Sequence, residues 1–242
     1  MSDRLDTRLA DREQTGSVPS PVTHVIVLPG GGHAEHASHE AEPVVAWLSG
    51  PGLSASVFRY PLNVRHPEPL LALRAEIRRL RGQGADRIGV VGFSGGGHLA
   101  GHVALAPTDD PSEQVQFAVL GYAITSMETE TYRPSRVILL GEDASPALRR
   151  ATSLDSLVTS RSPPFFLWHT AEDIYVPPEQ TYRLAAAPAT HEVPHTVHVF
   201  PHGPHSPGLA QGNGGAAAWT AFAKVWSAEQ VRAPIPPHAR RS

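Results

Sequence analysis

The sequence predicts an α/β protein with one open, mostly parallel sheet covered by helices on both faces. Short apolar runs rich in Val, Ile and Phe alternate along the chain with segments in which apolar residues recur every three or four positions. The first pattern is typical of buried strands, and the second of helices that pack one face against a sheet. Because no internal repeat is visible, we expect one domain over residues 22–228.

The helix expected at residues 67–81 shows the second pattern most clearly, since Leu70, Leu73, Ile77 and Leu80 share one face. Strands are expected at residues 24–28, 54–60, 87–93, 117–122, 164–169 and 196–200, and further helices at residues 40–48, 98–105, 179–187 and 216–226. Residues 123–161 do not alternate cleanly. In an open parallel sheet they would lie beyond the carboxyl end of a strand, where ligands bind, so we expect a small lid or cap there.

Composition excludes several classes of protein. The chain has 242 residues, 40% of them hydrophobic, and no run of 18 apolar residues, which argues against a membrane protein. The net charge of −3 and the lack of a long basic stretch argue against nucleic-acid binding. The absence of cysteine removes disulfides and thiolate metal sites. Residues 1–21 lack the apolar core of a secretory signal, so we expect disordered tails at residues 1–21 and 229–242, and a cytoplasmic location.

The first chemical motif is Gly92-Phe93-Ser94-Gly95-Gly96, which lies between an expected strand and an expected helix. A sharp strand-to-helix turn would raise Ser94 Oγ above the sheet edge, and the small flanking residues would let the backbone close that turn. The helix N-terminus would direct the amide of Gly95 at a developing oxyanion. A tight glycine turn without chemistry is the alternative explanation of this short motif.

The second motif, Pro29-Gly30-Gly31-Gly32, follows the first expected strand. Glycines there allow backbone amides to approach a substrate, which would supply a second oxyanion donor. A phosphate-binding loop would need a Gly-Lys-Ser/Thr ending, and a dinucleotide-binding loop a different glycine spacing, so both are disfavoured.

A serine nucleophile needs an imidazole to accept its proton and a carboxylate to orient that imidazole. Where such an elbow carries the serine, the acid and then the histidine follow it along the chain. Asp173 follows a buried strand and is our preferred acid, with Glu172 as a close rival. His202 and His205 both follow the last expected strand, and either could lie over Ser94.

Histidines near the glycine loop also suggest a metal site. His33, His36 and His39 are spaced by three residues, and His98 and His102 have helical spacing. Neither group has an acidic partner at a spacing typical of zinc sites, so we expect no metal and no other cofactor.

Taken together, these motifs resemble the α/β-hydrolases related to bacterial acetyl-xylan and feruloyl esterases, and are similar also to the hormone-sensitive-lipase and arylformamidase branches. The resemblance spans residues 25–209 and rests on residues 28–32, 40–43, 59–60, 92–100, 139–141, 163–165, 168–170, Asp173, 176–177 and 203–205. It departs from the group at Gly95, where relatives more often have Ala, at Ser206, where they often have Gly, and at His33, where many have Tyr or Phe.

The resemblance implies an α/β-hydrolase fold with Ser94 as nucleophile, Asp173 as acid, His205 as base, and the amides of Gly31 or Gly32 with Gly95 as oxyanion hole. We therefore expect a cofactor-free serine esterase, monomeric or homodimeric, that acts on small-molecule esters with small acyl groups. Polymeric xylan is not expected as its substrate. The alternatives are an arylformamidase or acyltransferase with the same triad, and a non-catalytic receptor on a hydrolase scaffold.

Overall fold

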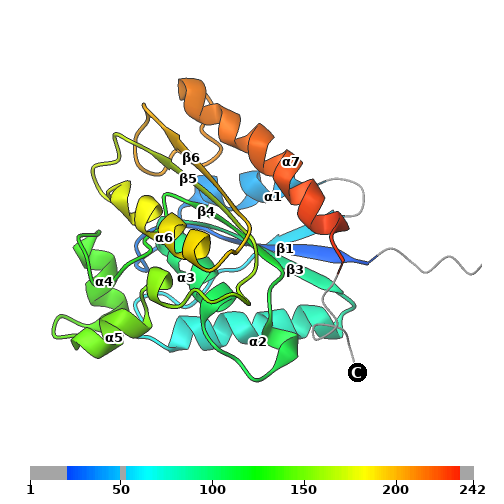
Figure 1. Cartoon of the computed structure of the whole chain (residues 1–242), viewed down its shortest axis with the longest axis horizontal. Helices are drawn as coiled ribbons and strands as arrows, with labels where there is room; N and C mark the ends of the chain where they lie inside the picture. The colour runs from blue at the N-terminus through cyan, green and yellow to red at the C-terminus, as the bar shows by residue number, and fades with distance from the viewer. Residues whose placement is uncertain (1–20, 50–52, 235–242) are drawn as a thin grey trace, which may run out of the picture.

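The computed structural model describes residues 21–49 and 53–234 of the chain (Figure 1). The tail expected at residues 1–21 lies outside the described residues up to residue 20, and the tail expected at 229–242 lies outside them from residue 235. The second tail was predicted to begin too early, because residues 229–232 belong to the last helix. No helix in the described ranges is both long enough and apolar enough to cross a membrane.

One six-stranded sheet forms the centre of the described part of the chain, in the order β2-β1-β3-β4-β5-β6 with every neighbouring pair parallel. This confirms the expected fold class. The strands are β1 (Thr23–Leu28), β2 (Leu53–Val57), β3 (Arg87–Phe93), β4 (Phe117–Gly121), β5 (Phe165–Thr170) and β6 (His195–Phe200). Strand β3 is buried over its whole length, as expected of a central strand covered on both faces.

The described part of the chain has seven α-helices, of which five pack on the faces of the sheet (Figure 1). The seven are α1 (Glu42–Leu48), α2 (Glu68–Gly82), α3 (Ser94–Leu105), α4 (Arg133–Leu140), α5 (Pro146–Ala151), α6 (Glu179–Thr190) and α7 (Trp219–Arg232). The apolar residues of α2, α3 and α6 pack with Ile26 on one face of the sheet, and those of α1 and α7 pack with Val25 and Val27 on the other. Alternation of side chains along β1 produces this two-sided core.

Some element boundaries differ from those expected. Strand β2 ends at Val57 instead of residue 60, because β1, its one neighbour in the sheet, ends at Leu28. Helix α3 begins at Ser94, four residues earlier than expected, although its first turn contains three glycines. Close packing explains those glycines, since a Cβ on Gly96 would lie 2.2 Å from the carbonyl oxygen of Pro29.

Residues 123–161 contain α4 and α5 and pack as a small unit at the carboxyl edge of the sheet. Leu139 and Leu140 of α4 form an apolar cluster with Ile124, Met127 and Val176, the last of which follows β5. This segment also contacts the glycine loop after β1, because Ser135 Oγ lies 2.7 Å from Nδ1 of His33. It therefore borders the end of the sheet at which Ser94 lies.

The opposite end of β3 contacts the last helix. The guanidinium of Arg87, the first residue of β3, donates hydrogen bonds to the carbonyl oxygens of Gln230 and Ala233 at the end of α7. Carbonyls in the last turn of a helix have no partner within the helix, and this cation supplies one.

Candidate active site

Ser94 lies at the junction of β3 and α3 with a φ of 50°, in the left-handed region that a non-glycine residue seldom adopts. The turn closes because the residues two positions away on either side lack a side chain. A Cβ on Gly92 would lie 2.5 Å from the carbonyl oxygen of Gly96, and one on Gly96 would collide with β1. Strain at this position is typical of a residue whose side chain must point away from the sheet.

His205 comes from the loop after β6, and its imidazole reaches Ser94. The distance from Ser94 Oγ to Nε2 of His205 is 3.0 Å, within hydrogen-bonding range. The rings of Tyr122 and Tyr175 contact this imidazole edge to face and obliquely, with centroids 5.2 and 5.7 Å away. These contacts restrict the orientation of the imidazole.

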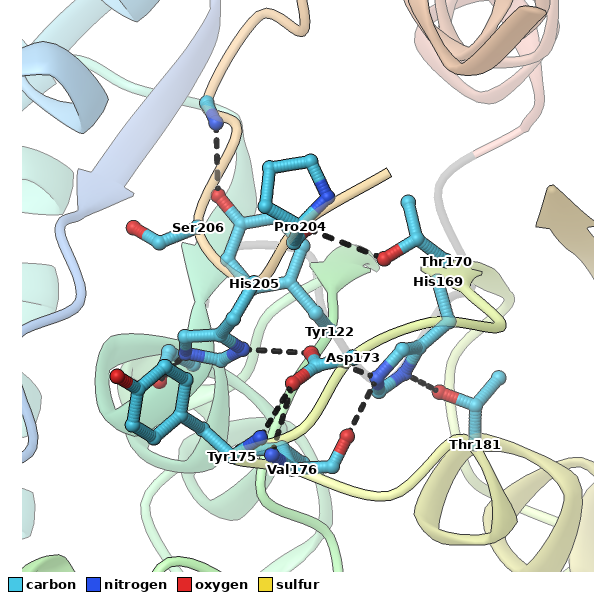
Figure 2. A network of polar contacts seen from close by, with 12 residues as sticks. Tyr122, His169, Thr170, Asp173, Tyr175, Val176, Thr181, Pro204, His205 and Ser206 are labelled. Carbon is cyan, nitrogen blue, oxygen red and sulfur yellow. Dashed lines mark hydrogen bonds and ion pairs between the residues drawn. The ribbon is translucent and has the colours of Figure 1, made fainter. Parts of the chain in front are cut away.

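Asp173 comes from the loop after β5 and holds the other side of the imidazole (Figure 2). Its Oδ2 accepts a hydrogen bond from Nδ1 of His205 at 2.6 Å. Its Oδ1 accepts the backbone amides of Tyr175 and Val176, both at 2.9 Å. With Nδ1 donating to a carboxylate, the neutral imidazole presents an acceptor at Nε2, toward Ser94.

The carboxyl group of Asp173 is buried, and burial by itself would raise its pKa. The hydrogen bonds from His169, His205 and the amide of Val176 outweigh burial, so the pKa of Asp173 lies below its ordinary value. The group is therefore an anion at neutral pH, as a partner for an imidazolium must be.

His169 also contacts this carboxylate and was not among the predicted site residues. Its Nε2 lies 3.1 Å from Oδ2 of Asp173 and 2.9 Å from the carbonyl oxygen of Val176, so Nε2 carries the proton and donates to both acceptors. Its Nδ1 lies 2.7 Å from Oγ1 of Thr181 on α6 and accepts the hydroxyl proton. Figure 2 shows the two histidines on opposite sides of Asp173. Within the sequence, His169 has the appearance of one more buried strand residue.

The structure places the two rivals elsewhere. Nδ1 of His202 lies 2.9 Å from Oε1 of Glu172, and their side chains are 82% and 59% exposed. Glu172 also accepts the amide of Gly203. The geometry therefore favours Asp173 and His205 as the partners of Ser94.

The glycine loop lies against the start of α3. Gly31 and Gly32 have φ values of 118° and 61°, which suit glycine, and a Cβ on Gly95 would lie 3.3 Å from the amide nitrogen of Gly32. The amide of Gly95 belongs to the first turn of α3, where no carbonyl one turn back can accept it. The three expected oxyanion residues are thus close together beside Ser94.

The five histidines considered as metal ligands contact other groups. Nδ1 of His33 bonds Ser135, Nε2 of His98 donates to the carbonyl oxygen of Thr152, and Nε2 of His39 donates to the carbonyl oxygen of Ser206. His36 packs against Tyr60, and His102 against His66. Burial lowers the pKa of His33 to about 3 and that of His98 to about 4. In the described ranges, no three His, Asp or Glu side chains are arranged to hold a metal ion.

The chain is similar to a known protein family and to solved structures of hydrolases. The BD-FAE family model matches residues 73–187. A crystal structure of an acetyl ester-xyloside bifunctional hydrolase from Caldicellulosiruptor lactoaceticus is 37% identical, with a TM-score of 0.81 over 88% of this chain and 85% of that one. The carboxylesterase Cest-2923 from Lactobacillus plantarum WCFS1 is 27% identical, with a TM-score of 0.74 over 92% of this chain and 90% of that one.

One curated protein is similar over part of its length. Endo-1,4-beta-xylanase B from Butyrivibrio fibrisolvens is 28% identical over an alignment of 201 residues, and the match covers 75% of this chain and 32% of that protein. The chain thus spans about a third of the length of the curated relative that it matches.

Proposed function

Because this chain belongs to the α/β-hydrolase family of esterases, we propose that it is a serine hydrolase of carboxylic esters with small acyl groups. One observation carries the proposal. The side chains of Ser94, His205 and Asp173 form a continuous hydrogen-bonded chain, with steps of 3.0 and 2.6 Å. This is the arrangement that activates a serine nucleophile.

In the proposed mechanism, Ser94 Oγ attacks the carbonyl carbon of the ester while Nε2 of His205 accepts its proton. Asp173 stabilises the resulting imidazolium through Nδ1. When the tetrahedral intermediate collapses, the imidazolium returns the proton to the departing alcohol, and an acyl group remains on Ser94. Water then attacks this acyl-enzyme while His205 accepts its proton. The imidazolium returns that proton to Ser94 Oγ as the bond from Oγ to the acyl carbon breaks, and the carboxylic acid leaves.

The negative charge on the carbonyl oxygen needs donors that are already in place. We assign this role to the amide of Gly95 and to an amide of Gly31 or Gly32. The short distance between the glycine loop and the first turn of α3 supports this assignment.

Acetylated xylosides are the first substrates to test. The structure that is 37% identical is described as an acetyl ester-xyloside hydrolase, and the curated relative is a xylanase. A substrate screen should also include a formamide such as formyl-kynurenine and an acyl acceptor other than water. Preference for either would replace the esterase proposal by arylformamidase or acyltransferase activity on the same residues.

Labelling with a fluorophosphonate tests the nucleophile. Ser94→Ala should abolish covalent labelling and lower kcat for p-nitrophenyl acetate by about 10⁴- to 10⁶-fold, as removal of a triad member does in other serine hydrolases. Ser49→Ala, at an exposed serine after α1, is the matched control and should label normally. Labelling that persists in Ser94→Ala would disprove the assignment.

A further inference from the structure

A second carboxylate, that of Glu40, lies behind the candidate active site and is fully buried. Burying a carboxylate is costly unless hydrogen bonds compensate it. Here three neutral donors do so. The amide of Gly30 donates to Oε2 at 2.7 Å, and the hydroxyls of Tyr122 and Ser206 donate to Oε1, each at 2.6 Å. Nε2 of His39, a largely exposed side chain, lies 3.6 Å from Oε1.

These donors come from the two loops that flank Ser94. Gly30 directly precedes Gly31 and Gly32, whose amides are the proposed oxyanion donors. Ser206 directly follows His205. Glu40 therefore joins the glycine loop to the loop that carries the proposed base, with one carboxylate oxygen bound to each.

Tyr122 strengthens the connection to the histidine loop. Its hydroxyl donates to Glu40 and accepts the amide of Gly208 at 3.1 Å, and its ring packs edge to face against His205. Burial, and then the nearby charge of Glu40, raise the pKa of Tyr122, so the hydroxyl stays protonated and remains a donor.

Gly30 packs closely between the carboxylate and Ser94. A Cβ on Gly30 would lie 2.7 Å from Oε2 of Glu40 and 3.0 Å from Cβ of Ser94. Gly30 thus separates the nucleophile from the buried carboxylate by a single backbone layer. The glycine loop lies directly beside Ser94, so a displacement of Glu40 would shift this loop relative to the nucleophile.

We propose that Glu40 is a positioning residue that sets the separation of the oxyanion amides from His205. This inference rests on the proposed function. The oxyanion amides act on the carbonyl oxygen of the ester, and His205 acts on Ser94 and the departing alcohol. Both must therefore be placed around one substrate, and a displacement of about 1 Å can lower the rate about 100-fold. Glu40 touches neither Ser94 nor His205 through a hydrogen bond, so its effect passes through Gly30, Ser206 and Tyr122.

Ser206 provides the variant least prone to misfolding. Its φ of 59° lies in the left-handed region, so Ser206→Gly removes the hydroxyl at a position where glycine is the less strained residue. Glu40→Gln keeps the size of the side chain, but an amide cannot accept from all three donors. Glu42→Gln is the matched control, because Glu42 is exposed and pairs with Arg59 at the surface.

We would measure kcat and KM for p-nitrophenyl acetate together with thermal stability. Glu40→Gln should lower kcat by about 10- to 100-fold and Ser206→Gly by about fivefold, with KM within about twofold of the wild type. Ser206→Gly should remain folded and lose less melting temperature than Glu40→Gln, because two donors to the carboxylate remain. The double variant should be no slower than Glu40→Gln alone, because the Ser206 hydroxyl acts through Glu40. Glu42→Gln should match the wild type.

Wild-type kcat in both Glu40→Gln and Ser206→Gly would overturn the inference, as would an effect confined to KM or a fully additive double variant. If Glu40→Gln does not fold, the kcat of Ser206→Gly decides. Ser94→Ala separates this inference from the proposed function. If that variant is inactive while the Glu40 and Ser206 variants keep full activity, only the positioning role fails. If Ser94→Ala still hydrolyses the ester, the proposed function fails first.

Discussion

Nε2 of His169 lies 3.1 Å from Oδ2 of Asp173, the same oxygen that accepts Nδ1 of His205 at 2.6 Å. The carboxylate is therefore held between two imidazoles, one of which faces Ser94 while the other is fixed to α6 through Thr181. Because hydrogen bonds on both sides fix the orientation of this carboxylate, it accepts from His205 in one direction. The position of the proposed base thus depends on a buried histidine that does not touch Ser94.

His169→Phe tests this dependence. The variant keeps an aromatic ring in the buried site but removes the donor to Asp173, so we expect kcat to fall by about tenfold with KM nearly unchanged. Steady-state kinetics with p-nitrophenyl acetate would measure both constants. His191→Phe, at an exposed histidine after α6, is the control. An unchanged kcat in His169→Phe would show that the amides of Tyr175 and Val176 orient Asp173 without His169.

Asp173 should also make stability depend on pH. Its pKa is lowered in the folded state, so it contributes stability above its ordinary pKa of 3.8, and this stability is lost as the pH falls through the folded pKa. Asp173→Asn should therefore be less stable than the wild type by about 3 kcal/mol at pH 7, with a difference that shrinks below pH 4. Urea unfolding at pH 7, 5 and 3 measures it. Glu172→Gln is the exposed control, and a difference for Asp173→Asn that is constant with pH would contradict the expectation.

The rival residues give a direct comparison. Asp173→Asn and His205→Ala should each lower kcat by about 10³-fold or more, whereas Glu172→Gln and His202→Ala should cost less than about tenfold. The reason is geometric, because His202 and Glu172 bind each other at the surface and neither contacts Ser94. The reverse ranking of kcat values would mean that the neighbouring residues, not Asp173 and His205, form the relay.

Much of the fold follows from the sequence because its signals are local. Buried strands such as β3 are apolar after their first residue, α2 has a regular apolar face, and the glycines around Ser94 specify a turn that few other residues allow. Each of these features is complete within a few consecutive residues. That is why the six strands and the position of Ser94 could be predicted.

The choice between Asp173 and Glu172 depends on loop geometry. Both follow β5, and only the turn that brings the amides of Tyr175 and Val176 onto Oδ1 of Asp173 separates them. Glu40 illustrates the same limit over a longer range, since its partner Ser206 is 166 residues away. No local pattern reveals a contact that the folded loops create.

The length of the acyl group should be limited by Tyr132. Phe93, the residue before Ser94, is buried against Tyr122 and Trp219 in the core and does not line the acyl side of the site. Instead, a Cβ on Gly32 would lie 3.1 Å from the ring of Tyr132, so this tyrosine closes over the glycine loop.

With p-nitrophenyl esters, kcat/KM should therefore peak between acetyl and butyryl and fall by at least about tenfold at octanoyl, since methylenes that do not fit reverse the gain from burial. Tyr132→Ala should shift the optimum to longer acyl groups. Tyr182→Ala, at an exposed position on α6, should not. An octanoyl optimum in the wild type would indicate an extended apolar channel and a lipase-like enzyme.

The contact of Arg87 with the end of α7 joins the first residue of the strand that leads to Ser94 to the last helix of the described chain. If α7 detached, the guanidinium of Arg87 would lose its two carbonyl acceptors. The loss of these hydrogen bonds adds to the free energy needed to separate α7 from β3. The amides of α7 and β3 should therefore exchange hydrogen as one cooperative unit. The helix most remote from Ser94 along the chain would then unfold together with the strand that supports it.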